Sequence, residues 1–371
     1  MKKDWTYKKL GEVADTYRGL TYSKKDEVEH SSKAVLRSNN IDLTSHQLNF
    51  DEIKYIREDF VIPQDKLVKK DSIFICMSNG SMQHLGKVAY IDKEYNFAFG
   101  GFMGLVVPKE IVNAKYVYYS MLADNFLSTI MKEGKGANIN NLRFSDVENY
   151  LIPIPPLSIQ RSIVSELDLL HSFIEKKQEQ LRALDNLAQS LFYQMFGDPI
   201  TNPMGWEIKK FAELYKLKSG DGLSAKMFEN GPYPVYGGNG ISGQHCSYNM
   251  DGNYIIIGRV GVYCGNVRNV VGKFWLTDNA FQLFYDEDNN NPIFVTKLLT
   301  YLNLNQYANQ AAQPVISNIT LKDILVPLPP LSLQQSFAAK VSAIEAQKQA
   351  ITQSIHHTEA LLAQRMDQYF G

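Results

Sequence analysis

Cysteine is scarce in this chain, with three among 371 residues. Cys76, Cys246 and Cys264 show no Cys-x-x-Cys spacing, so the sequence predicts neither a disulfide framework nor a zinc site, and we expect buried free thiols. Long apolar runs are also missing, because no window approaches the roughly 18 uncharged apolar residues of a membrane span, and no signal peptide is recognisable. We therefore expect a cytoplasmic protein with no membrane partner.

A large charge of either sign is absent too, since the formal net charge is −1. This value gives no global basic signature, so nucleic-acid binding would have to depend on local patches. The composition, with 44% hydrophobic and 21% charged residues, is that of a folded globular protein.

Motifs of enzyme catalysis are lacking as well. Residues 238–243 match the Gly-x-Gly-x-x-Gly pattern of dinucleotide sites, but a loop follows where that motif requires a helix. Asp51 to Lys54 contain carboxylates and a lysine, which we interpret as a solvated face, and His356-His357 as an exposed pair on a helix. We expect no catalytic residue, metal ligand or cofactor in this chain, and therefore no enzyme activity of its own.

A repeat is the strongest feature that the chain does have. The stretch 151–160, Leu-Ile-Pro-Ile-Pro-Pro-Leu-Ser-Ile-Gln, returns at 325–334 as Leu-Val-Pro-Leu-Pro-Pro-Leu-Ser-Leu-Gln, and this offset of 174 residues holds without a gap for 47 residues. Proline fixes φ and lacks an N–H, which predicts an extended entry into a helix. Ser158 is the expected N-cap of the first copy, and Ser332 with Gln335 suggests a capping box in the second.

Each copy is followed by a pattern typical of a coiled-coil helix. Apolar residues recur at alternating spacings of four and three, at nine of ten positions in the first copy and seven of ten in the second. About 37 residues at about 1.5 Å each predict rods of roughly 55 Å. We expect the two helices to pair in antiparallel fashion, although two separate amphipathic helices remain an alternative. The predicted seam residues are Ile163, Leu167, Leu170, Ile174, Leu181, Leu184, Leu191, Phe337, Val341, Ile344, Ile351, Ile355 and Leu362.

The regions outside these helices predict two globular units of faintly similar sequence. The expected fold class is α+β, with domains at 1–150 and 198–324 separated by spacer helices at 151–197 and 325–371. A short helix and turn is expected at 5–20 and a helix at 116–131. Strands are expected at 73–77, 87–91, 104–107, 254–257 and 281–285, and a helix at 294–301.

Polar loops in both units carry side chains that can pair with bases. Arg can bind guanine in a bidentate manner, Asn and Gln can bind adenine, and Lys holds phosphates. The candidate DNA-binding residues are Arg37, Asn39, Asn40, Ser78, Asn79, Gln83, Lys135, Asn138, Asn140 and Arg143 in the first unit, and Tyr236, Gly238, Asn239, Arg259, Tyr263, Asn266, Asn309 and Gln310 in the second.

The duplicated Pro-Pro-Leu-x-x-Gln motif, at 155–160 and 329–334, resembles that of specificity subunits of type I restriction-modification enzymes. Residues 236–243, 257–261 and 277–280 are similar to one common recognition-domain subtype. The first unit departs from this subtype, since 77–81 and 99–102 occupy the places comparable to 257–261 and 278–281.

The resemblance implies that each domain reads one half of a bipartite, asymmetric double-stranded DNA target. It further implies that the helix pair sets the half-site separation and docks two methyltransferase subunits, which carry S-adenosylmethionine and modify adenine; a motor endonuclease subunit is a further partner left open. Two alternatives remain: the recognition subunit of a related enzyme that cuts beside its site, and a coiled-coil adaptor that binds protein or glycan instead of DNA.

Overall fold

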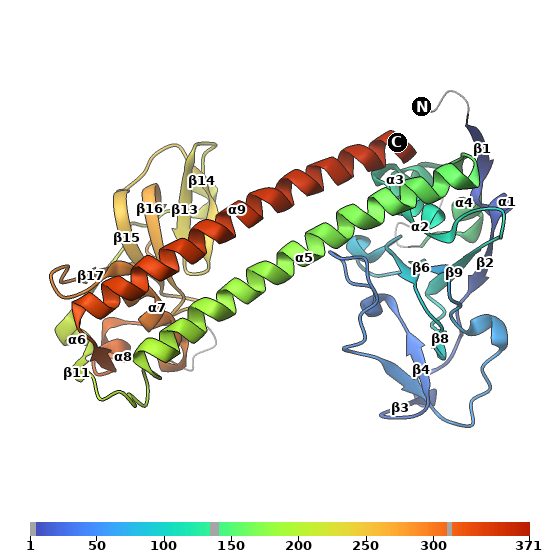
Figure 1. Ribbon diagram of the computed structural model, residues 1–371. Helices are drawn as coiled ribbons and strands as arrows, with labels where there is room; N and C mark the ends of the chain where they lie inside the picture. The colour runs from blue at the N-terminus through green and yellow to red at the C-terminus, as the bar shows by residue number, and fades with distance from the viewer. Residues whose placement is uncertain (1–4, 134–140, 310–313) are drawn as a thin grey trace. The chain divides into compact units, whose positions relative to one another are not determined.

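The computed structural model describes residues 5–133, 141–309 and 314–371. The chain divides into two compact units (Figure 1). Unit 1 contains residues 1–177 and 354–371, and unit 2 contains residues 178–353. Each unit thus combines one of the expected globular domains with about half of each long helix, whereas the sequence suggested separate domain and helix segments.

Unit 1 is built on two four-stranded sheets with helices packed on them (Figure 1). The strands predicted at 73–77, 87–91 and 104–107 are confirmed. The first sheet has the order β2 (Ala14–Arg18), β9 (Met103–Pro108), β6 (Ser72–Cys76), β7 (Val88–Ile91), and the second β3 (Glu27–Val28), β5 (Lys54–Ile56), β4 (Lys33–Leu36), β8 (Phe97–Phe99). Every residue of β6 is buried, as expected for a central strand with a continuous apolar sequence.

Two helix predictions in unit 1 need correction. The segment 5–20 forms β1 (Thr6–Lys9), α1 (Leu10–Val13) and β2 rather than a helix and turn. The helix expected at 116–131 is two helices, α2 (Ala114–Leu122) and α3 (Asp124–Glu133), because Ala123 adopts an extended conformation with ψ 142°. A further short helix, α4 (Phe144–Asn149), precedes the first proline motif.

Unit 2 contains one six-stranded sheet, and its predicted strands and helix are confirmed (Figure 1). The sheet order is β12 (Tyr215–Ser219), β17 (Ala280–Tyr285), β15 (Met250–Gly258), β16 (Val267–Leu276), β13 (Tyr233–Gly237), β14 (Gly240–His245). The helices are α6 (Phe211–Leu214), α7 (Pro292–Tyr301) and α8 (Asn318–Leu321). Asn291 caps α7 through its side chain and Pro292 occupies the first helical position, where the missing N–H costs no hydrogen bond.

The proline motifs enter the fold as short strands. In unit 1, β10 (Leu151–Ile154) pairs antiparallel with β1, and in unit 2, β18 (Leu325–Leu328) pairs in the same way with β11 (Glu207–Lys210). The duplication therefore includes the strand that closes each globular domain, and not only the helix that follows it.

The long helices α5 (Leu157–Phe196) and α9 (Leu331–Phe370) have 40 residues each, which corresponds to about 60 Å. None of the predicted seam residues is exposed, as a seam between the two helices requires. Within unit 1, Glu166 accepts a hydrogen bond of 2.6 Å from Tyr369 Oη, and within unit 2, Asp185 binds Lys348 at 2.6 Å. In both units the segments of α5 and α9 run antiparallel.

The glutamine of each motif, rather than its serine, anchors the helix. Ser158 and Ser332 are the second helical residues, not N-caps, and the box expected with Gln335 does not form. Gln160 is 1% exposed; its Nε2 donates to the Pro155 carbonyl at 2.8 Å. Gln334 is fully buried and binds Pro329 in the same way, also at 2.8 Å.

Candidate nucleic-acid interface

The same backbone hydrogen bonds organise the loops at one sheet end of each unit. In unit 1, Gly100 N–H donates to the Leu36 carbonyl at 2.9 Å, and in unit 2, Thr277 N–H donates to the Tyr236 carbonyl at 3.0 Å. In unit 1 the bond holds the end of β4 beside the loop that follows β8. In unit 2 it holds the end of β13 beside the loop that follows β16.

A second pair of bonds extends the equivalence. Met77 N–H donates to the Phe102 carbonyl at 3.0 Å, and Arg259 N–H donates to the Asn279 carbonyl at 2.9 Å. The carbonyls of Met77 and Arg259 then accept bonds of 2.8 and 2.9 Å from the residues that precede the next helix, Leu142 and Ile316. We call these segments the reading loops: 37–40, 77–80 and 100–102 in unit 1, and 237–240, 259–263 and 277–279 in unit 2.

These shared hydrogen bonds define which residues of unit 1 and unit 2 are structurally equivalent. Asn39 and Asn239 both lie three residues beyond the first acceptor, while Arg37 corresponds to Gly237. The sequence comparison aligned 77–81 with 257–261 and 99–102 with 278–281. In the structure both alignments are shifted by two residues, because Met77 corresponds to Arg259 and Phe102 to Asn279.

The reading loops of unit 1 surround a cavity of about 630 Å³. Of the predicted residues, Arg37, Asn39, Ser78 and Asn79 line it, together with Phe102, whose side chain is 72% exposed. Arg37 lies 3.9 Å from the Glu27 carboxylate and is held by it only loosely. This guanidinium can exchange its protein partner for a base edge or a phosphate at little cost.

A tyrosine also faces this cavity. Tyr22 lines the cavity, and burial raises the pKa of its hydroxyl, which is protonated at neutral pH and can donate a hydrogen bond. The cavity therefore offers a cation, an amide, a hydroxyl and an exposed aromatic ring within one concave surface.

The reading loops of unit 2 surround a smaller cavity of about 530 Å³. Gly238, Asn239, Thr277 and Asn279 line it. A Cβ at Gly238 would lie 2.3 Å from the Val260 carbonyl oxygen, so this position requires glycine. Residues 238–243 form a turn and strand β14, with no helix after them, and this geometry agrees with the rejection of a dinucleotide site.

Arg259 supplies the cation of unit 2, from a different strand end than Arg37 in unit 1. Its Nη1 donates to Ser219 Oγ at 3.3 Å and to the Asp278 carbonyl at 3.4 Å, and the guanidinium lies 5.4 Å from the Phe281 ring centroid. Both bonds are long and the residue is half-buried. The side chain is oriented by its neighbours while retaining donors for a ligand.

Some predicted residues have structural roles instead. Asn40 is 1% exposed, and its side-chain amide is hydrogen-bonded within the loop. It accepts from Arg37 N–H at 2.8 Å and donates to the Asn49 carbonyl at 2.9 Å. Tyr236 is half-buried, with its ring 5.3 Å from that of Phe274. We correct the assignment of Asn40, because its buried amide is already bonded within the loop, whereas Tyr236 remains a candidate.

Other predicted residues lie near the loops with differing availability. Ser78 bonds Asn141, Asn79 donates to Ser38 at 2.9 Å, and Asn309 accepts from Val315 N–H at 2.9 Å, which orders these loops. Four predicted residues are exposed and accessible to a ligand: Gln83, Arg143, Tyr263 and Asn266. Lys135, Asn138, Asn140 and Gln310 lie outside the described residues.

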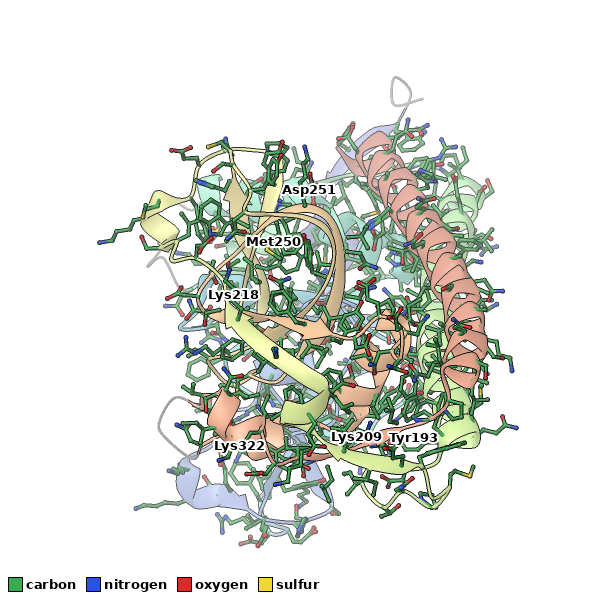
Figure 2. The ribbon with its side chains drawn as sticks, turned by 90° about the vertical axis from the view of Figure 1, so that its left-hand side faces the viewer. Tyr193, Lys209, Lys218, Met250, Asp251 and Lys322 are labelled. Carbon is green, nitrogen blue, oxygen red and sulfur yellow. The ribbon has the colours of Figure 1, made fainter. Side chains whose placement is uncertain are left out.

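Sequence reasoning missed the exposed lysines of unit 2. Figure 2 shows the exposed Lys218 on β12 and Lys322 beside α8, and the half-buried Lys209 on β11. Lys216 and Lys218 are exposed on the same face of β12, an edge strand, and Lys218 precedes Ser219, which contacts Arg259. In the sequence, Lys216 and Lys218 alternate with Tyr215, Leu217 and Ser219, and this alternation could have identified the two lysines as the exposed face of a strand. Phe102 and Asn279 were missed because only the loop hydrogen bonds reveal their equivalence.

The cysteine prediction holds for two residues of three. Cys76 and Cys264 are buried, and burial raises the pKa of both thiols, while Cys246 is exposed. None of the helices in the described part of the chain combines the length and apolar character needed to cross a bilayer.

Residues 2–184 and 203–358 match the family described as type I restriction modification DNA specificity domain, and the chain belongs to this family. The chain is 22% identical over 264 residues to the type I restriction enzyme EcoKI specificity subunit of Escherichia coli strain K12, covering 67% of this chain and 56% of that protein. It is 29% identical over 222 residues to the EcoprrI specificity subunit of Escherichia coli, covering 56% and 55% respectively. The chain thus spans about half the length of these curated relatives, although the match to the StySPI specificity subunit of Salmonella potsdam covers 85% of that protein at 21% identity.

The fold is shared with a solved structure, the type I restriction-modification system S subunit from M. genitalium. The TM-score is 0.61 at 17% identity, and the match covers 99% of this chain and 96% of the other. A structure described as showing the basis of complex assembly and conformational transition of the type I R-M system matches with a TM-score of 0.57 at 16% identity. The expected α+β architecture with two long helices is confirmed.

Proposed function

We propose that this chain is the specificity subunit of a type I restriction-modification enzyme and that its two units read two different DNA half-sites. The observation that carries the proposal is the pair of reading-loop sets, which share backbone hydrogen bonds but differ in side chains. A common backbone can approach DNA in a common way, while the side chains at its open end determine the bases selected.

The different placement of the two arginines predicts different half-sites. Arg37 follows β4 in unit 1, whereas Arg259 follows β15 in unit 2, and each is replaced by a different residue in the other unit. Because arginine reads guanine through a bidentate bond, guanine is expected at a different position in each half-site. The full target is then asymmetric and interrupted.

The exposed lysines of unit 2 would hold the DNA backbone beside these loops. Phosphate contacts position a protein on the duplex without selecting sequence, and Lys216 and Lys218 are exposed on the edge strand β12. Such local contacts account for DNA binding by a chain with a net charge of only −1.

The paired long helices would set the distance between the half-sites and dock two methyltransferase subunits. Those subunits would hold S-adenosylmethionine and transfer its methyl group to adenine, while this chain supplies sequence selection and no chemistry. A motor endonuclease subunit would join the assembly when DNA is cut. The supporting features are the seam residues, none of which is exposed, and the family to which the chain belongs.

The test is to co-express the chain with its cognate methyltransferase and to sequence the methylated bases of the host genome. The expected result is one bipartite motif with two unlike halves and a fixed non-specific gap. A continuous or palindromic motif would contradict the proposal. A salt-dependent DNA shift assay separates it from a protein or glycan adaptor, for which no steep salt slope is expected.

A further inference from the structure

We propose that Glu229, His245 and Cys246 form a zinc site in unit 2, at the open end of the β13–β14 hairpin. One ligand atom from each residue can be chosen so that all three lie within 4.8 Å of one another. Glu229 lies four residues before β13, His245 ends β14, and Cys246 follows it. The three side chains therefore come from both arms of the hairpin, opposite the turn that carries Asn239.

His245 is the residue that most clearly lacks a partner. It is 8% exposed, and its Nδ1 is buried with no hydrogen-bond partner in the described part of the chain. The ring stands edge-on to Trp275, with centroids 5.3 Å apart, so its orientation is fixed. A buried imidazole nitrogen without a partner costs free energy, and a metal ion at the cluster would supply one.

Cys246 and Glu229 form the accessible side of the cluster. The thiol donates a hydrogen bond to Glu229 Oε2 at 2.5 Å, and both residues are exposed, so an ion can reach them from solvent. On binding, the S–H bond breaks, its proton leaves to water, and the thiolate and the carboxylate both become metal ligands.

The chemistry of the three donors selects the ion. Thiolate and imidazole are poor ligands for Mg²⁺ and Ca²⁺, which take oxygen ligands, whereas Zn²⁺ accepts sulfur, nitrogen and carboxylate oxygen together. Three protein ligands leave one tetrahedral position for a water molecule. The charge of the ion also balances the thiolate and the carboxylate.

The backbone around the cluster is already tightly arranged. A Cβ at Gly231 would lie 2.2 Å from the His245 carbonyl oxygen and 2.4 Å from the Cys246 Cα, so only glycine allows the two arms to approach this closely. Because β14 is the edge strand of its sheet, it is bonded on one side only. A zinc ion here would tie together the two arms of the edge hairpin at its open end.

The experiment uses the full chain without an affinity tag that binds metals. Zinc is titrated against a competing chromophoric chelator, and Co²⁺ is used as a spectroscopic probe. The expected result is one tightly bound equivalent of Zn²⁺, a cobalt spectrum with a thiolate-to-metal charge-transfer band, and a higher unfolding temperature with zinc than without it. These readouts need no DNA, so they are independent of the proposed recognition function.

Exposed ligands provide variants that keep the fold. Cys246→Ser should abolish the charge-transfer band, and Cys246→Ser and Glu229→Gln should each weaken zinc binding by at least about tenfold. Glu287→Gln and His357→Asn remove an exposed acid and an exposed histidine elsewhere, and should leave affinity unchanged. Equal zinc affinity in wild type and both ligand variants, or no stoichiometric binding to wild type, would overturn the site.

Discussion

Gln160 Oε1 accepts the backbone N–H of Asn113 at 2.8 Å, and Asn113 in turn caps α2. In unit 2, Gln334 accepts the N–H of Asn291 at 2.9 Å, and Asn291 caps α7. The conserved feature of the internal repeat is thus a buried amide that joins the start of each long helix to the start of a domain helix. It holds each recognition domain in a defined orientation on its own part of the helix pair.

Removing this amide should destabilise its unit. Gln160→Ala leaves the Asn113 N–H and the Pro155 carbonyl without partners inside the protein, which should cost about 1–3 kcal/mol in unfolding free energy. Urea denaturation measures the loss. The matched control is Gln335→Ala, an exposed glutamine next to Gln334, which should change stability by less than about 0.5 kcal/mol. Equal effects of the two variants would argue against an anchoring role.

Each arginine of the reading loops should affect one half-site only. Arg259→Lys keeps the charge but loses the bidentate fork, and should relax selection at one base pair by about 1–3 kcal/mol. Sequencing of methylated sites in the presence of the partner methyltransferase shows which half has changed. Arg37→Lys should relax the other half, and Arg182→Lys, an exposed residue of α5, neither. If Arg37 and Arg259 altered the same half, the assignment of one half-site to each unit would be wrong.

Lysines of β12 should contribute affinity without selectivity. Lys218→Gln is expected to weaken binding to all sequences alike and to lower the slope of log K against log salt by about one. DNA binding of the methyltransferase complex at several salt concentrations measures this slope. Lys340→Gln, which removes an exposed lysine of α9, is the control. A change in the methylated motif would show that Lys218 reads bases after all.

Unit 1 should lose stability as the pH falls through the titration range of histidine. His46 and His171 line a cavity of about 520 Å³, and burial lowers the pKa of both, against the opposing effects of Asp42 on His46 and of Glu175 and Asp168 on His171. Both histidines are then neutral when folded and take up protons on unfolding below about pH 6.5, so stability is present above that pH and decreases below it.

Denaturation midpoints at about pH 7.5 and about pH 5.5 test this histidine effect. His171→Gln should reduce the difference between the two midpoints. His356→Gln, an exposed histidine of α9 in the same unit, should leave it unchanged. The same pH dependence in wild type and His171→Gln would rule out the buried histidine as its source.

The helix pair should behave as a spacer of adjustable length. One heptad inserted into each of α5 and α9, next to the ion pair of Asp185 and Lys348, preserves the seam and adds about 10.5 Å, or about three base pairs of DNA. Methylation sequencing should show both half-sites unchanged and a longer gap. An unaltered gap would exclude the helices as the determinant of spacing.

The sequence alone determined the duplication, the two long helices and five of the strands, β6, β7, β9, β15 and β17. Period and composition are local properties, so the seam from Ile163 to Leu191 and the apolar run of β6 were readable without contacts. The break at Ala123 was not, because helix propensity continues across it and tertiary packing decides where α2 ends.

Only the tertiary structure decided which loop residues share a surface. Arg37, Asn79 and Phe102 are far apart in the chain and meet because long-range backbone bonds bring three strand ends together. Asn40 was indistinguishable from Asn39 in sequence, yet one is buried and the other exposed, since a one-residue step turns the side chain inward. The cluster of Glu229, His245 and Cys246 has no spacing motif and exists because a hairpin joins its two arms. The periodicity of apolar residues determines helices and strands. A binding site depends on contacts between helices, strands and loops that are distant in the chain, and no local sequence pattern contains those contacts.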